Sequence, residues 1–153
     1  MRPTTLDDFV GQEHLVGPNK PLRVAMEKGH VFSFILWGPP GVGKTTLARM
    51  YAKAIKREVV EISAVNTGKD DMRVAAEKSA VLFIDEIHRF NKTQQDFLLP
   101  YVERGQLVLI GATTENPSFE VISPLLSRCR VFVLNELTGD DMMKIIERTK
   151  VKM

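Results

Sequence analysis

The stretch "VFSFILWGPPGVGKTT", residues 31–46, decides the fold of this chain. The mostly apolar residues 31–37 predict a buried strand, and the glycine-rich residues 38–43 predict a tight turn after it. Residues 45–55 then place apolar side chains at helical spacing, which predicts a helix. A strand, a glycine-rich turn and a helix are the context in which the pattern G-x-x-x-x-G-K-[ST], here residues 38–45, binds phosphate.

The chemistry of this turn predicts a nucleotide site. Its glycines allow backbone N–H groups to approach a polyphosphate at the start of a helix. Lys44 reaches the β- and γ-phosphates, and the hydroxyl of Thr45 is suited to ligate Mg²⁺. We therefore expect ATP or ADP with Mg²⁺ as cofactors. The predicted nucleotide-contacting residues are Gly38, Pro39, Pro40, Gly41, Val42, Gly43, Lys44, Thr45 and Thr46.

Outside the turn, short apolar runs alternate with helical patterns. This alternation predicts an α/β fold with a five-stranded parallel sheet, helices on both faces and a ligand site at the carboxyl ends of the strands. The other predicted strands are residues 58–63, 80–85, 106–112 and 130–134, and the other predicted helices are 21–28, 69–78, 92–104, 123–128 and one that begins after 138.

Capping residues mark several predicted helix starts. Asn91 with Gln94, and Thr138 with Asp141, have the spacing of reciprocal caps, and Ser123 is the predicted N-cap of the short helix at 123–128.

Composition narrows the class of protein. With 153 residues, 44% of them hydrophobic and 26% charged, the chain suits one globular domain. A formal net charge of +2 is too small to indicate nucleic-acid binding by itself. One cysteine, no zinc-site spacing and no long apolar segment lead us to expect a soluble, intracellular protein in a reducing compartment, with no membrane partner.

Two carboxylates directly follow the apolar run 80–84. If that strand neighbours the glycine-rich turn, Asp85 is placed to hold the Mg²⁺ shell and Glu86 to activate an attacking water. The alternative is a solvated strand end. The complete phosphate-binding pattern upstream favours the catalytic interpretation.

A polar cluster, "GATTENPSFEVISPLLSRC" at residues 111–129, follows another apolar strand. Thr113, Thr114 and Asn116 are expected near the γ-phosphate, although turn chemistry also explains Asn116. Arg128 is predicted to point away from its own site. An arginine finger given to a neighbouring subunit and a plain surface charge both remain open for it on the residues alone.

Four segments together resemble one family. "RPTTLDDFVGQ", "GPPGVGKTT", "LFIDEIHRFNKTQQD" and "GATTENPSF" with "LLSRCRV" are similar to the AAA+ P-loop ATPases of the RarA/MgsA group, relatives of the Werner-helicase-interacting protein. Clamp-loader subunits and the Holliday-junction motor RuvB look like more distant relatives. The resemblance covers almost the whole chain.

The resemblance implies further assignments. It implies strand order 5-1-4-3-2, Asp85 and Glu86 as the Walker B pair, Thr114 as sensor 1 and Arg128 as a trans-acting arginine finger. It also implies adenine packing by Val10 and Gly11. The implied domains are residues 1–134 as the ATPase core, with 1–30 as its N-terminal box and helix, and 135–153 as the start of a truncated helical lid.

The resemblance also implies an activity and partners. These are DNA-dependent ATP hydrolysis at stalled forks and recombination intermediates by a homo-oligomer, with single-stranded-DNA-binding protein as an associate and a cytoplasmic, nucleoid-associated location. A nucleotide-dependent assembly module with little hydrolysis is the alternative. A small-molecule kinase would leave "GATTEN" and "SRC" unexplained.

The chain departs from the family pattern in two places: residues 68–80 look about a dozen residues short, and the chain stops at the predicted lid, so its own ATPase rate is in question.

Overall fold

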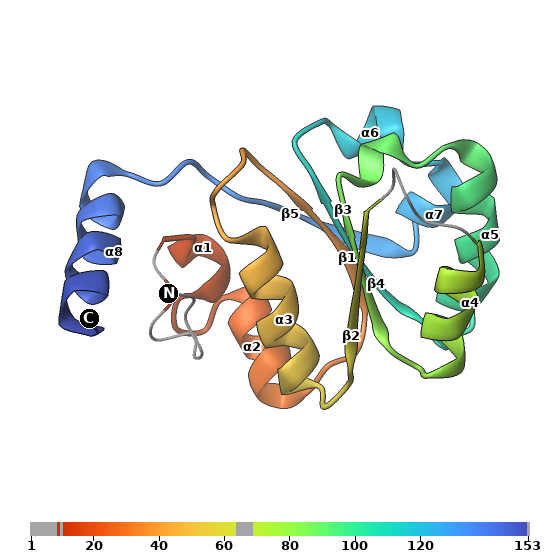
Figure 1. The fold of residues 1–153 in the computed structure, drawn as a ribbon, viewed down its shortest axis with the longest axis horizontal. Helices are drawn as coiled ribbons and strands as arrows, with labels where there is room; N and C mark the ends of the chain where they lie inside the picture. The colour runs from red at the N-terminus through yellow and green to blue at the C-terminus, as the bar shows by residue number, and fades with distance from the viewer. Residues whose placement is uncertain (1–8, 10, 64–68, 153) are drawn as a thin grey trace.

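The computed structural model describes residue 9 and residues 11–63 and 69–152. Five parallel strands form its centre in the order β2-β3-β4-β1-β5 (Figure 1). This is the predicted order 5-1-4-3-2 counted from the opposite edge, so both the fold class and the strand order are confirmed. The strands are β1 (Ser33–Trp37), β2 (Val59–Ser63), β3 (Val81–Asp85), β4 (Val108–Thr113) and β5 (Cys129–Val133).

Helices cover both faces of the sheet (Figure 1). On one side lie α1 (Glu13–Val16), α2 (Pro21–Lys28) and α3 (Lys44–Ala54). On the other lie α4 (Lys69–Glu77), α5 (Lys92–Glu103) and α7 (Ser123–Leu126). The single-turn elements η2 (Ile87–Arg89) and α6 (Pro117–Glu120) follow β3 and β4, and α8 (Gly139–Lys152) lies apart from the sheet.

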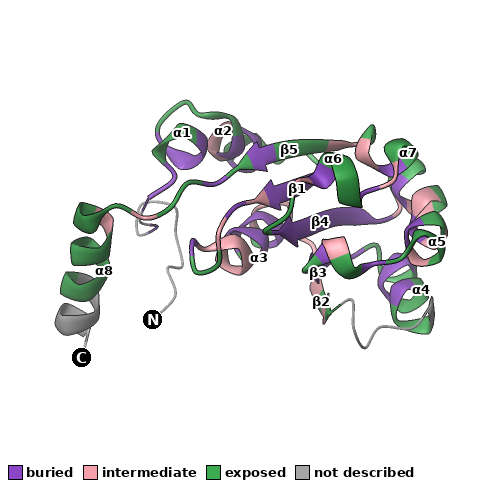
Figure 2. Ribbon diagram, turned by 90° about the horizontal axis from the view of Figure 1, so that it is seen from above, coloured by how far each residue is buried: buried purple, intermediate pink, exposed green. Residues whose placement is uncertain are grey.

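Two hydrophobic clusters hold these layers together. Because side chains alternate along a strand, Phe34 and Leu36 of β1 enter the cluster under α3, whereas Ile35 enters the cluster under α5. In the first cluster the rings of Phe34 and Tyr51 meet edge to face, with centroids 5.0 Å apart. Burial on both faces explains why β1, β3 and β4 consist of nearly uninterrupted apolar residues. Figure 2 shows these central strands as buried and α8 as exposed.

The reciprocal caps form where the sequence predicted them. Asn91 accepts from the N–H of Gln94 at 2.8 Å, and Gln94 accepts from the N–H of Asn91 at 2.9 Å. Thr138 and Asp141 make the equivalent pair at 3.0 and 3.1 Å. In each pair both residues satisfy a backbone N–H that the start of a helix leaves free, so both predicted reciprocal caps are confirmed.

The prediction that Ser123 is an N-cap is wrong. Helix α7 already begins at Ser123, its N-cap is Ile122, and no side chain caps it. Ile122 takes the role because its extended backbone (φ −60°, ψ 143°) lets its carbonyl accept from the N–H of Leu126. The N-terminus of this short helix is therefore held by other means, which the buried side chain of Gln95 supplies.

The end of the chain contains one long helix. Strand β5 ends at Val133 and α8 begins at Gly139, so the predicted domain boundary falls in the connection between them. Met142, Met143, Ile145 and Ile146 give α8 a partly exposed apolar side. Within the described residues no helix combines the length and apolarity needed to cross a membrane.

Candidate nucleotide-binding site

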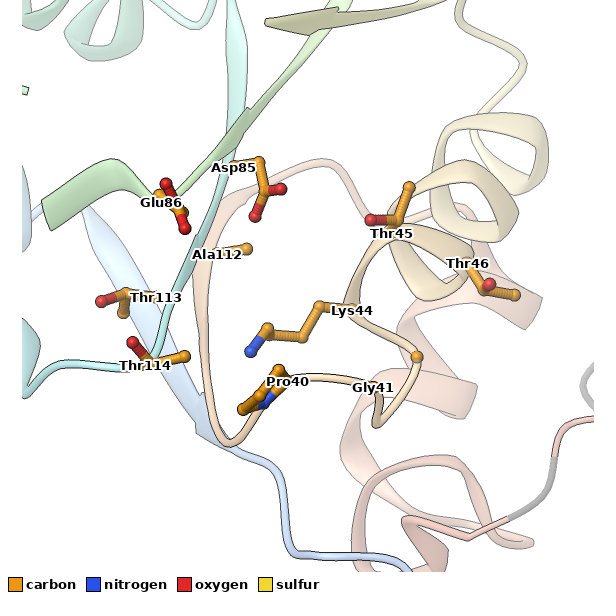
Figure 3. Close-up of a pocket in the computed structure, with 11 residues that line it drawn as sticks. Pro40, Gly41, Lys44, Thr45, Thr46, Asp85, Glu86, Ala112, Thr113 and Thr114 are labelled. Atoms are coloured by element: carbon orange, nitrogen blue, oxygen red, sulfur yellow. The ribbon is translucent and has the colours of Figure 1, made fainter. Parts of the chain in front are cut away.

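A cleft of about 350 Å³ opens at the carboxyl edge of the sheet (Figure 3). Its lining comes from the loop after β1, the start of α3 and the ends of β3 and β4. These segments meet because parallel strands direct their carboxyl ends to one edge. The lining residues are Pro40, Gly41, Gly43, Lys44, Thr45, Thr46, Asp85, Glu86, Ala112, Thr113 and Thr114.

The loop backbone requires glycine at Gly41 and Gly43. Both have positive φ angles, 78° and 98°. At Gly43 there is a second reason, because a Cβ atom would lie 2.6 Å from the ring of Phe9. Gly43 is also the N-cap of α3, so the free N–H groups of the first helical turn face the cleft. Such a turn at a helix N-terminus is suited to hold phosphate oxygens.

Lys44 projects from the first turn of α3 into the cleft (Figure 3). Its ammonium group donates to the carbonyl of Gly38 at 2.6 Å and to that of Pro39 at 3.0 Å. Partial burial lowers the pKa of Lys44 below its ordinary value, and the Asp85 carboxylate partly offsets that effect. A partly desolvated ammonium group strengthens the attraction for an anionic ligand.

Thr45 and Asp85 face each other across the cleft in Figure 3, whereas Thr46 lies farther along α3. A hydroxyl and a carboxylate are the hard oxygen ligands that Mg²⁺ accepts, with water and phosphate oxygens completing its shell. Among the described residues no group of three or more His, Cys, Asp or Glu side chains gathers to hold a metal. One hydroxyl and one carboxylate fit part of the shell of a Mg²⁺ ion that arrives with a nucleotide.

Glu86 adopts a left-handed backbone conformation, φ 54° and ψ 49°. It directly follows β3 and caps η2, and its carboxylate lies 3.3 Å from the guanidinium of Arg89. A non-glycine residue in this region is uncommon and costs about 1–2 kcal/mol. Sequence patterns carry no signal for this conformation.

The end of β4 presents two threonines with different surroundings. Thr113 is 1% exposed, and its hydroxyl accepts from the N–H of Glu115 at 2.9 Å and contacts His88 Nδ1 at 3.1 Å. Thr114 is exposed and lines the cleft. Asn116 does not line it and instead caps α6 by accepting from Ser118. Of the three polar residues predicted near the γ-phosphate, the structure thus brings Thr113 and Thr114 to the cleft.

Some predicted nucleotide contacts frame the cleft without lining it. Gly38 and Pro39 supply the carbonyls that Lys44 contacts, and Val42 is buried. Gly11 lies against Leu137, because a Cβ atom there would meet its Cδ2 at 2.8 Å. The prediction for Val10 lies outside the described residues.

Arg128 lies at the opposite end of the sheet. It directly precedes β5, whereas Val133 at the far end of β5 pairs with Trp37 beside the phosphate loop. Five residues of strand at about 3.3 Å each separate Arg128 from the level of the cleft by about 16 Å. Its side chain is 55% exposed, 4.0 Å from Glu103. Arg128 is therefore out of reach of the cleft in its own chain.

A set of contacts that sequence reasoning missed joins the N-terminal segment to the connection before α8. Gln12 exchanges two hydrogen bonds of 2.8 Å with the backbone of Asn135, and His14 contacts the carbonyl of Val133 at 2.6 Å. Because Phe9 packs on Gly43, this segment bridges the phosphate loop and the base of α8. The partners are more than 100 residues apart, so no local pattern predicts them.

The model of one protein family, "ATPase family associated with various cellular activities (AAA)", matches residues 34–137. Among the similar curated proteins, the replication-associated recombination protein A of Haemophilus influenzae is 50% identical over 97% of this chain, and that of Coxiella burnetii is 53% identical over 96%. ATPase WRNIP1 of Dictyostelium discoideum is 47% identical over 97% of the chain and matches over 18% of its own length. The chain spans only 35% of the length of the two bacterial relatives.

The fold also has close matches among solved structures. One structure of the RuvB Holliday junction branch migration motor of Thermotoga maritima superposes with a TM-score of 0.80 and 36% identity, over 99% of this chain and 54% of that one. The family match covers the phosphate loop, both carboxylates of the cleft and Arg128. The chain belongs to the AAA family of ATPases.

Proposed function

We propose that this chain binds ATP with Mg²⁺ and hydrolyses the γ-phosphate bond. The observation that carries this proposal is the convergence of Lys44, Thr45, Asp85, Glu86 and Thr114 on one cleft, although they come from three separate segments of the chain. A cation, two oxygen ligands, a carboxylate base and a polar positioning group form the set that phosphoryl transfer to water needs.

The residues of the loop and of α3 bind and orient the nucleotide. The backbone N–H groups after Gly41 hold the phosphate oxygens, and Lys44 spans the β- and γ-phosphates. Thr45 and Asp85 hold the Mg²⁺ ion, which when bound neutralises charge on the phosphates. Gly11, with Val10 beside it in sequence, contributes to the adenine side of the site.

Glu86 acts on the attacking water. The water oxygen forms a bond to the γ-phosphorus while the bond from that phosphorus to the leaving oxygen of ADP breaks, and Glu86 accepts the proton that the water loses. Thr114 holds the water or a γ-phosphate oxygen in line. The products are ADP, inorganic phosphate and a protonated carboxyl group.

A neighbouring copy completes the site with Arg128. The backbone of Arg128 is about 16 Å along the strand from the level of its own cleft. Its guanidinium is exposed, and a guanidinium is suited to bind a phosphate oxygen of another subunit. We therefore propose a homo-oligomer in which each chain donates one arginine. Helix α8 contributes to a helical lid in this arrangement.

The relatives suggest what hydrolysis drives. Two of them carry names that refer to replication-associated recombination, and the structural match is a motor for branch migration of Holliday junctions. We propose that the protein containing this chain remodels DNA, or proteins on DNA, at replication forks and recombination intermediates. Single-stranded-DNA-binding protein and a nucleoid location fit the same proposal.

Two variants test this mechanism. Glu86→Gln should retain ATP affinity in titration calorimetry and lose about 10²–10⁴-fold in turnover, as expected for removal of a general base. Arg128→Ala should also retain affinity, and should abolish the rise of specific activity with protein concentration. If Glu86→Gln leaves phosphate release unchanged, the chain is instead a nucleotide-dependent assembly module with little hydrolysis.

A further inference from the structure

A buried glutamine lies between the catalytic turn and the helix that leads to Arg128. Gln95 of α5 is 2% exposed and does not line the cleft. Its Nε2 donates to the carbonyls of Phe90 at 3.1 Å and Glu120 at 2.9 Å. Its Oε1 accepts from the N–H of Ile122 at 2.7 Å. One side chain therefore joins three backbone groups that belong to two different loops.

The geometry of this amide leaves it no freedom. Both N–H groups of Nε2 are used, and rotating the amide by 180° would place Oε1 against two carbonyl oxygens. Buried amides with all donors paired are strongly oriented, because each broken bond leaves an unsatisfied polar group in the core. The side chain of Gln95 is thus held in one orientation and fixes the relative positions of the three backbone groups that it bonds.

The first loop leads back to the cleft. Phe90 directly follows η2, the single turn capped by Glu86, and its ring is 3% exposed in the cluster under α5. The bond from Gln95 therefore fixes the far end of the turn that carries the catalytic carboxylate.

The second loop leads to Arg128. Glu120 ends α6 and Ile122 caps α7, so Gln95 holds the connection between these helices on both sides. Helix α7 has only four residues and no side-chain cap, and beyond its own backbone it is anchored by the fully buried Leu125. Arg128 follows two residues after α7 ends, against Glu103 of the same helix α5. Helix α5 thus lies beside the whole segment that presents the arginine (Figure 1).

We propose that Gln95 is a positioning residue that sets the placement of Arg128 for the site of a neighbouring copy and links it to the Glu86 turn. The proposal rests on the donated arginine described above. Because an error of about 1 Å in a catalytic group costs about 10²-fold in rate, a four-residue helix needs such a fixed support.

The backbone angles at Ile122 allow a proline substitution that breaks its hydrogen bond to Gln95. Its φ of −60° is the angle of proline, and Val121 before it has the extended conformation (φ −105°, ψ 131°) that precedes proline readily. Ile122→Pro therefore deletes the N–H that Gln95 accepts and places the proline ring against Oε1, so the bond is lost and the amide is displaced while the backbone angles stay compatible. Ile122→Ala is the matched control that shortens the side chain and keeps the N–H. Gln95→Met is the second variant, and Gln106→Met is its control, since among the described residues the side chain of Gln106 bonds only to the carbonyl of Ala76.

The test distinguishes the subunit that supplies Arg128 from the subunit whose cleft hydrolyses ATP. The variants are made in the longest natural protein that contains this sequence, and ATP turnover is measured in mixtures of two subunit types. Arg128→Ala subunits accept but cannot donate, and Glu86→Gln subunits donate but cannot hydrolyse. Their mixture should recover turnover. We expect a donor that also carries Ile122→Pro or Gln95→Met to recover about 10- to 100-fold less, whereas donors with Ile122→Ala or Gln106→Met recover it fully.

The outcomes are distinguishable. Full recovery with the Ile122→Pro and Gln95→Met donors overturns the positioning role and leaves the proposed function intact. A loss that appears only when Gln95→Met is placed in the acceptor, with full recovery by the Gln95→Met donor, shows that Gln95 acts on the Glu86 turn of its own site alone, which overturns its role in placing Arg128. No recovery in the basic Arg128→Ala and Glu86→Gln mixture contradicts the donated arginine and the role of Gln95 that rests on it, whereas the proposed ATP hydrolysis is tested separately by Glu86→Gln alone. Thermal melts show which donor variants are folded, and only folded donors are compared. If Gln95→Met does not fold, the Ile122→Pro donor alone tests the proposal.

Discussion

Replacing Gly111 with alanine should disturb the Glu86 turn without touching the cleft. A Cβ atom on Gly111 would lie 2.8 Å from Cδ1 and 3.2 Å from Cγ2 of Ile87, and 3.1 Å from Cδ1 of Ile35. Ile87 directly follows Glu86 and is fully buried, so its backbone carries any displacement to the carboxylate. Gly111 itself does not line the cleft.

The expected magnitude follows from two opposing effects. Alanine in a strand is favoured over glycine by about 0.5–1 kcal/mol, whereas inserting a methyl group into a close-packed core costs about 1–3 kcal/mol. The net loss of unfolding free energy for Gly111→Ala is therefore about 1 kcal/mol. Ile87→Val removes Cδ1, the atom at 2.8 Å, and costs about 0.5–1.5 kcal/mol by itself. In the double variant the methyl group gains room, so the combined loss should fall about 1 kcal/mol short of the sum.

Urea denaturation and ATP turnover together test this reasoning. Gly111→Ala should bind ATP normally and turn it over about tenfold more slowly, since a shift below 1 Å costs less than the about 10²-fold of a full ångström. Ile87→Val should restore part of that rate. Ile35→Val relieves the other close contact of the new methyl group, at 3.1 Å, and should restore stability only. Losses that add within about 0.5 kcal/mol, or an unchanged rate in Gly111→Ala, would refute the argument.

Four further outcomes are expected. Burial raises the pKa of the Cys129 thiol to about 12, so at pH 8 its thiolate fraction, and its alkylation rate by iodoacetamide, should be about a thousandfold below those of the urea-unfolded chain; equal rates would contradict this. Asn91→Ala removes one half of a reciprocal cap and should cost about 1 kcal/mol in a denaturant melt. Gln12→Ala should speed hydrogen exchange at the Asn135 amide, which loses its acceptor. Glu86→Gly should be more stable than Glu86→Gln by about 1 kcal/mol, since glycine adopts the left-handed conformation freely; a less stable Glu86→Gly would exclude backbone strain at this position.

The parts of this fold that could be predicted are those whose causes are local in sequence. Doubly buried strands appear as continuous apolar runs, and a phosphate loop is a contiguous pattern, so the parallel sheet and most of the cleft followed from them, whereas the strand order came from the family resemblance. Helix α6 was missed because its four residues also suit a turn after Asn116. The bonds of Gln95 to Ile122 and of Gln12 to Asn135 join residues 27 and 123 positions apart. Such contacts depend on how the layers pack, which periodicity does not encode.

The same distinction explains why both acidic residues after β3 reach one cleft. Successive side chains of an extended strand point to opposite faces, so a strand continued through Asp85 and Glu86 would direct only one of them to a phosphate site. The left-handed backbone at Glu86 ends the strand and turns its carboxylate back to the side of Asp85, so that both line the cleft. Glycine or asparagine would adopt this conformation at lower cost. Neither provides the carboxylate base that we propose for this site, so the proposed chemistry, and not the stability of the turn, accounts for a glutamate at this position.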